Sequence, residues 1–169
     1  MPRVAVNHKS ITDPDARRRP VRKLVPEGRY AAIIANAKTG ATNNNLSKIT
    51  VEFQMTGILD EETNAIETET EDAKPIIGQR IFQDYLLEED VRYPDLALVH
   101  RYELVRLLEA TEAPYDDEGF DTDDLVGKGV LVRVVHREGS KKDDEGNPMV
   151  FANVKDVDSP EPVNESDLV

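Results

Sequence analysis

The segment 49–56 alternates strictly between apolar and polar side chains, and this pattern constrains the fold more than any other feature of the chain. Its apolar members are Ile49, Val51, Phe53 and Met55. A period of two residues is typical of a β-strand with one buried face. Four further segments have strand-like composition, over residues 29–35, 77–87, 130–136 and 149–157. We therefore expect a mainly β chain.

A single helix is expected between the third and the fourth of these strands. Pro94 and Asp95 suit its first turn, and Pro114 stops it. Between the two prolines, apolar side chains recur at helical spacing at Leu98, Tyr102, Leu104, Val105, Leu107 and Leu108. Such a stripe predicts a helix that packs against the sheet with one face.

The order of three strands, a helix and two strands is that of the OB-fold, a small and partly open barrel. We expect a five-stranded OB-fold-like barrel with one helix between strands 3 and 4, plus flexible termini. An α+β sandwich with one covering helix is compatible with the same pattern. The expected domain covers residues 23–158, including an acidic loop over 60–74. A flexible basic arm over residues 1–22 precedes it, and an acidic disordered tail over residues 159–169 follows it.

Charge is distributed unevenly along the chain. The formal net charge is −13, yet residues 1–48 carry ten Lys or Arg and only three Asp or Glu, a local charge of +7. The remaining residues carry −20. The net charge argues against nucleic-acid binding, which needs cations, but the asymmetry indicates segments with different roles. The basic arm is either a solvated tail or a nucleic-acid-binding arm.

The sequence lacks the motifs of common catalytic and metal-binding sites. It has no cysteine, and its three histidines are scattered without metal-ligand spacing. A phosphate-binding glycine loop, a nucleophile elbow and a dinucleotide motif are all missing from the sequence. We therefore expect no enzymatic activity, no cofactor and no metal. No apolar run approaches the roughly 18 residues of a membrane helix. The polar, basic N-terminus does not resemble a secretory signal, and the lack of cysteine is compatible with a reducing cytoplasm, so we expect a cytoplasmic protein.

Five short stretches carry a resemblance to a known family. They are VPEGRY at residues 25–30, GQRIF at 78–82, ELVRLLEA at 103–110, LVGK at 125–128 and NVKD at 153–156. In this order and spacing, the chain resembles phage-encoded single-stranded DNA-binding proteins of OB-fold type. The resemblance implies single-strand protection in phage replication or recombination, in the host cytoplasm and without catalysis. The acidic loop and the Arg-rich arm depart from the family pattern.

Single-strand binding requires cations along the phosphates and exposed aromatic faces on which bases stack. OB-folds place both on strands two and three and on the neighbouring loops. The candidate nucleic-acid-binding residues are Lys38, Lys48, Arg80, Phe82, Arg133, Phe151 and Lys155. Strand alternation places Arg80 and Phe82 on one side of the third strand. In the fifth strand it places Phe151 and Lys155 on the outer side and Val150 on the inner side. Phe82 and Phe151 are therefore favoured as exposed rings, whereas Tyr30, Phe53 and Tyr102 are assigned to the core.

Two further points concern partners. The acidic tail resembles the docking peptides of single-strand-binding proteins, so we expect it to bind replication or recombination proteins. The main alternative function is a non-enzymatic phage structural or protein-interaction module with an acidic surface. The basic arm favours nucleic acid, whereas the net charge favours the alternative. The family resemblance implies DNA as the nucleic acid. Both functions are compatible with a homo-oligomer.

Overall fold

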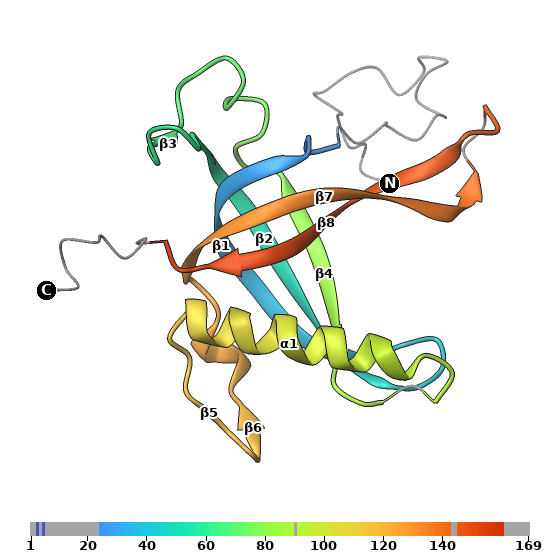
Figure 1. Cartoon of the computed structure of the whole chain (residues 1–169). Helices are drawn as coiled ribbons and strands as arrows, with labels where there is room; N and C mark the ends of the chain where they lie inside the picture. The colour runs from blue at the N-terminus through green and yellow to red at the C-terminus, as the bar shows by residue number, and fades with distance from the viewer. Residues whose placement is uncertain (1–2, 4, 6–23, 90, 143–144, 161–169) are drawn as a thin grey trace, which may run out of the picture.

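The computed structural model describes residues 3, 5, 24–89, 91–142 and 145–160, and it shows one large antiparallel β-sheet with an α-helix packed against it (Figure 1). The sheet consists of β1 (Gly28–Ala41), β2 (Ser47–Leu59), β3 (Ile66–Glu67), β4 (Arg80–Leu86), β7 (Gly129–Lys142) and β8 (Pro148–Asp158). The helix is α1 (Pro94–Ala110), and it is followed by a small hairpin of β5 (Tyr115–Asp116) and β6 (Gly119–Phe120) and by the 3-10 turn η2 (Thr122–Asp124). The expected mainly β chain with a helix after its third long strand is confirmed.

The sheet is folded over but not closed. Its strands lie in the order β3-β2-β1-β7-β8, and β4 pairs with β2 beside β3. The edge strands β4 and β8 lie close to each other. The side-chain carbonyl of Gln83 on β4 accepts the backbone N–H of Val154 on β8 at 3.1 Å. Within the described ranges, no backbone ladder joins these two strands. The expected five-stranded barrel is therefore not confirmed, since a side-chain amide stands where ladder bonds would complete the closure.

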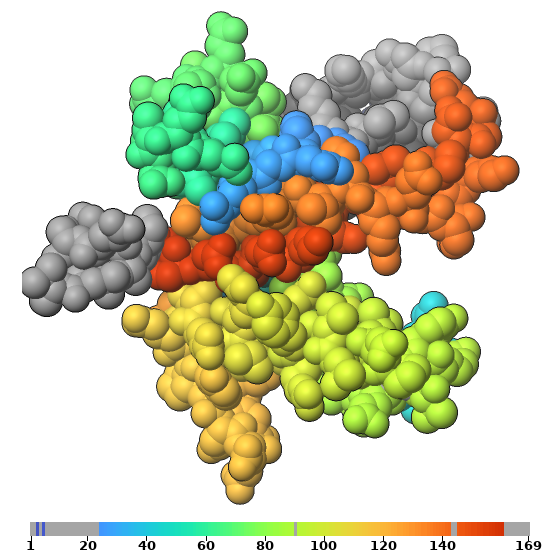
Figure 2. All heavy atoms as spheres, viewed as in Figure 1, coloured from blue at the N-terminus to red at the C-terminus, as the bar shows by residue number. Residues whose placement is uncertain are grey.

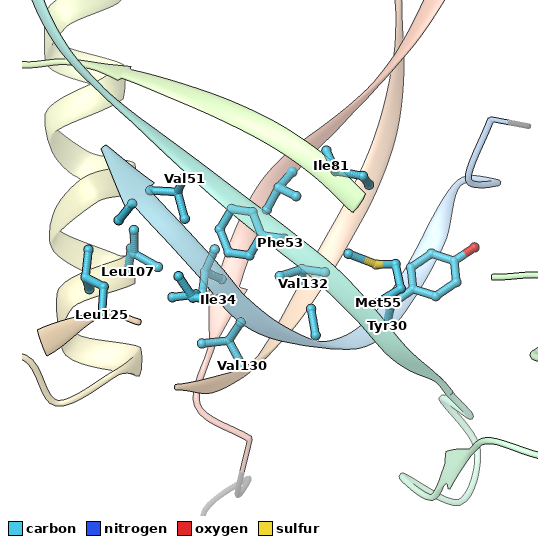
Figure 3. Close-up of a cluster of buried hydrophobic side chains, with 14 of the residues drawn as sticks. Tyr30, Ile34, Val51, Phe53, Met55, Ile81, Leu107, Leu125, Val130 and Val132 are labelled. Atoms are coloured by element: carbon cyan, nitrogen blue, oxygen red, sulfur yellow. The ribbon is translucent and has the colours of Figure 1, made fainter. Parts of the chain in front are cut away.

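The core lies between the folded halves of the sheet and α1 (Figure 3). Tyr30 and Phe53 are only 3% and 0% exposed, so their assignment to the core is confirmed. Val132 of β7 packs with them, and Leu107 and Leu125 close the end of the core beside the helix. Full burial of one such side chain stabilises the fold by about 1.5–3 kcal/mol.

The helix buries only part of its apolar stripe. Within Pro94–Ala110, Leu107 and Leu108 are buried, whereas Leu98 and Tyr102 are 51% and 60% exposed. The assignment of Tyr102 to the core is therefore wrong. The apolar stripe runs the length of the helix, but the core reaches only its C-terminal turns.

Several strand boundaries differ from those expected. β1, β7 and β8 are longer than the alternation predicts, whereas β4 begins at Arg80 and not at Ile77. Gly78 has a φ of 89°, in the left-handed region that favours glycine. Its N–H donates to the carbonyl of Met55 at 2.9 Å. The chain therefore turns at Gly78 before the strand can start.

β7 and β8 continue past the core as a two-stranded extension, which we call the β7–β8 tip (residues 137–142 and 145–151). It stands out from the rest of the molecule in the space-filling view (Figure 2). Val150, expected to point inward, is 42% exposed because the tip has no core beneath it.

The acidic loop over residues 60–74 is not wholly irregular, because it contains β3, which pairs with the end of β2. The expected basic arm lies outside the described residues except at positions 3 and 5, and so does the expected tail beyond residue 160. Of the helices in the described ranges, none is long and apolar enough to cross a membrane.

Candidate nucleic-acid interface

The outer surface of β1, β2 and β4 brings four of the seven candidate residues together. Buried and outward-facing residues alternate along β2, and the strand register carries this alternation to both neighbours. Two rows of cross-strand partners lie on the outer side, Lys38 with Thr50 and Asp84, and Asn36 with Glu52 and Phe82. The candidates that share this side are Lys38, Lys48, Arg80 and Phe82. We call this surface the β2–β4 face.

Phe82 is the exposed aromatic residue of the β2–β4 face. Its side chain is 53% exposed, whereas Ile81 and Tyr85 on the opposite side of β4 are buried. The alternation expected for this strand is therefore confirmed. Arg80 and Asp84 lie two residues before and after Phe82 on the same side. An exposed ring between charged neighbours can offer its face to a nucleobase while the charges stay in water.

Lys48 is held by a carboxylate of the neighbouring strand. Its Nζ donates to Oδ2 of Asp84 at 2.9 Å, and the Thr50 hydroxyl donates to Oδ1 of the same group at 2.5 Å. Burial alone would raise the pKa of Asp84, but the bonds from Thr50 and Lys48 outweigh it and hold that pKa below its ordinary value. The lysine is therefore fixed in place and partly neutralised.

Arg80 has a similar partner, and Lys38 does not. Nη1 of Arg80 donates to Oε1 of Glu52 at 2.5 Å. Lys38 is exposed and forms no ion pair with any described residue. Three cations thus share the β2–β4 face with two carboxylates, Glu52 and Asp84, and phosphates would meet a mildly basic surface.

Arg133 lies on the other half of the sheet. Its Nε is 3.7 Å from Oδ2 of Asp156, and its cross-strand neighbour is Arg29. Arg29 and Arg106 donate to the two oxygens of Asp158, at 3.2 Å and 2.7 Å. Arg133 therefore belongs to a cluster of arginine and aspartate side chains that is separate from the β2–β4 face. Residues of β1, β7, β8 and α1 form this cluster.

Lys155 also lies away from the β2–β4 face. The register shifts so that Arg133 pairs with Asp156 and Val134 pairs with Val154, which leaves Lys155 as the extra residue of a β-bulge. The strand alternation expected through Lys155 is interrupted there. Burial, and then the charge of Asp156, raises the pKa of the Glu103 carboxyl on α1, and nearby Lys155 partly offsets that rise. Lys155 thus lies near Glu103 of α1.

Phe151 lies on the β7–β8 tip and is 40% exposed. It pairs with Arg137 across the hairpin, and its ring lies against Gly139. The structure records no contact between this ring and Phe82 in the described residues. The two exposed phenyl rings therefore occupy separate places on the molecule.

Two features around the candidate residues could not be found from the sequence patterns. Glu52 and Asp84 neutralise cations on the β2–β4 face, but cross-strand partners depend on register, which alternation alone does not fix. The contact of Gly139 with Phe151 depends on register in the same way. The alternation within β4, which placed Phe82 on the side of Arg80, was available from the sequence.

No group of three or more His, Asp or Glu side chains in the described ranges is arranged to hold a metal ion. Comparison of the chain with protein-family models and with curated proteins finds no match. The functional assignment therefore depends on the geometry of the β2–β4 face and on the resemblance seen in the sequence.

Proposed function

We propose that the protein binds single-stranded nucleic acid, DNA in preference to RNA, through the β2–β4 face and without catalysis. The observation that carries this proposal is the exposed ring of Phe82 on a sheet surface that also presents Lys38, Lys48 and Arg80. Stacked bases and neutralised phosphates are the two requirements of single-strand binding. A role in phage replication or recombination follows from the sequence resemblance.

The architecture supports the same proposal. In OB-folds, ligands bind across the second and third strands, and here those are the long strands β2 and β4. The edge strands β4 and β8 meet through Gln83 and Val154. We infer an OB-type arrangement in which β4 and β8, the two strands that would close the barrel, are not joined by backbone hydrogen bonds.

The charge pattern sets an expectation for affinity. Lys38 is available to a phosphate. The charges of Lys48 and Arg80 are already partly neutralised by Asp84 and Glu52, respectively. Each single-strand phosphate that is neutralised contributes about −0.7 to the slope of log K against log salt. We therefore expect a shallow slope, between about −1 and −3, for contacts to this face.

The test is titration of a fluorescent oligo-dT of ~30 nucleotides, long enough to fill the ~4–16 nucleotides that one OB-type unit covers, at two salt concentrations. The proposal predicts saturable binding at low salt that weakens at the higher salt concentration. An oligo-rU of equal length measures the preference for DNA, and duplex DNA of the same sequence measures the preference for single strands. Absence of binding to every oligonucleotide at low salt would overturn the proposal.

One observation favours the alternative, a protein-interaction module with an acidic surface. A pocket of about 660 Å³ opens between Thr39 of β1 and the β5–β6 hairpin. Its lining includes the acidic residues Asp116, Glu118, Asp121 and Asp124. A basic partner would suit this surface, and nucleic acid would avoid it. Two sedimentation experiments separate the two functions, one with single-stranded DNA and one with a polylysine probe.

A further inference from the structure

The ring of Phe151 occupies the space that a side chain at position 139 would need. A Cβ atom added to Gly139 would lie 2.5 Å from Cε2 and 3.2 Å from Cδ2 of that ring. It would also lie 3.5 Å from the carbonyl oxygen of Met149, which is an ordinary contact. The ring therefore rests directly on the glycine backbone, across the hairpin.

The need for glycine at this position does not come from backbone conformation. Among the described glycines, those with positive φ are Gly28, Gly78, Gly119, Gly127 and Gly146. Gly139 is outside this set, so an alanine could adopt its backbone angles. The phenyl ring alone excludes a side chain at position 139, and the glycine in turn determines where that ring lies.

The Phe151 ring remains accessible to solvent although it contacts Gly139. Phe151 keeps 40% of its surface exposed although Gly139 covers part of it. Its cross-strand partner is the exposed Arg137, and the β7–β8 tip also carries the exposed residues Lys141, Lys142, Glu138 and Glu145. A fixed, half-open ring beside Arg137 offers a stacking surface that loses little conformational entropy when a base binds.

We propose that Gly139 is a positioning residue that holds the Phe151 ring in place against the β7–β8 tip, so that this ring forms a second base-stacking site, separate from Phe82. The ligand of this site is an unpaired base of the same single strand, and the inference therefore rests on the proposed function. Substitution of Gly139 moves the ring without removing any group that contacts the base.

The sequence allows a direct optical test because it contains no tryptophan. The Phe151→Trp variant carries a single indole at the proposed stacking position. Stacking of a base on this indole quenches its emission, so titration with oligo-dT is expected to lower the fluorescence. Adding Gly139→Ala to this variant displaces the indole, and we expect most of the quenching to be lost and affinity to fall by about 5-fold or more.

The matched control is Gly129→Ala in the same Phe151→Trp background. Gly129 also lies on β7, has no positive φ and would meet nothing within 4 Å of an added Cβ. We expect this control to keep the full quenching. Access of acrylamide to the indole without DNA reports ring displacement independently, and it should rise when Gly139→Ala is added and stay unchanged when Gly129→Ala is added.

The outcomes separate this inference from the proposed function. Oligonucleotide binding to the Phe151→Trp variant, seen by anisotropy, with unchanged indole emission would overturn the second stacking site and leave the proposed function standing. Equal quenching with and without Gly139→Ala would overturn the positioning role of Gly139. Absence of all oligonucleotide binding by the unsubstituted protein would overturn the proposed function itself.

Discussion

Arg80 and Glu52 form an ion pair across β4 and β2, with Nη1 of the guanidinium 2.5 Å from Oε1 of the carboxylate. The Glu52 side chain is only 11% exposed, whereas that of Arg80 is 53% exposed. The cation is therefore open to solvent, and its carboxylate lies beneath the surface. A phosphate that approaches the β2–β4 face meets the arginine and, behind it, a charge that opposes binding.

Glu52→Gln should strengthen single-strand binding. The substitution keeps a hydrogen-bond acceptor for Arg80 but removes the opposing charge, so the guanidinium can pair fully with a phosphate. We expect tighter binding at low salt and a slope of log K against log salt that is steeper by about 0.7, the value for one additional phosphate contact. Anisotropy titrations at four or five salt concentrations measure both quantities.

Asp156→Asn is the matched control for Glu52→Gln. It removes the carboxylate beside Arg133, on the other half of the sheet, and changes the net charge by the same amount. An equal gain of affinity in the two variants would show that overall charge, and not the β2–β4 face, controls binding.

His100 should make the fold sensitive to mild acid. Its Nδ1 accepts the backbone N–H of Leu86 at 2.8 Å, which requires an unprotonated ring nitrogen. Burial lowers the pKa of His100, and the charge of Asp84 only partly opposes this shift. The unfolded state therefore binds more protons, and the free energy of unfolding should fall as pH decreases below about 6.5, the ordinary histidine pKa.

Urea unfolding at pH 7.5 and at pH 5.5 measures this dependence. In His100→Asn, the side-chain oxygen can accept the same N–H but does not titrate, so the difference between the two pH values should shrink. A difference as large in His100→Asn as in the unsubstituted protein would assign the acid sensitivity to other groups.

The two halves of α1 should respond differently to truncation. Leu107→Ala removes a side chain that is 0% exposed and should cost about 2–5 kcal/mol of unfolding free energy. Leu98→Ala removes one that is 51% exposed and should cost less than about 1 kcal/mol. Urea unfolding measures both. Similar costs at the two positions would mean that another surface covers the N-terminal half of the helix.

The local patterns in the sequence were sufficient for most of the fold. Alternation over residues 49–56 placed β2 and its buried face, and Pro94 marked the start of α1. The exposure of Tyr102 could not be deduced, because a helical stripe does not reveal how far the core extends beneath it. β4 begins two residues after Gly78 because the positive φ of this glycine makes a turn. The strand-forming residues around Gly78 gave no sign of this turn.

The candidate interface was only partly accessible to sequence reasoning. Alternation within β4 correctly grouped Arg80 with Phe82. The separation of Lys155 from Phe151 depends on a β-bulge, and the pairing of Arg80 with Glu52 depends on cross-strand register. Both are properties of two strands together, and neither has a signal in one strand alone.

The most direct test of the central claim compares Phe82→Ala with Tyr115→Ala in the oligo-dT titration. Both remove an exposed aromatic ring, 53% and 47% exposed, but Tyr115 lies on the acidic β5–β6 hairpin. We expect Phe82→Ala to weaken binding by about 1–3 kcal/mol, the cost of one lost stacking contact, at an unchanged melting temperature. Tyr115→Ala should bind as the unsubstituted protein does. Equal affinity of the Phe82→Ala variant and the unsubstituted protein would contradict the assignment of the β2–β4 face.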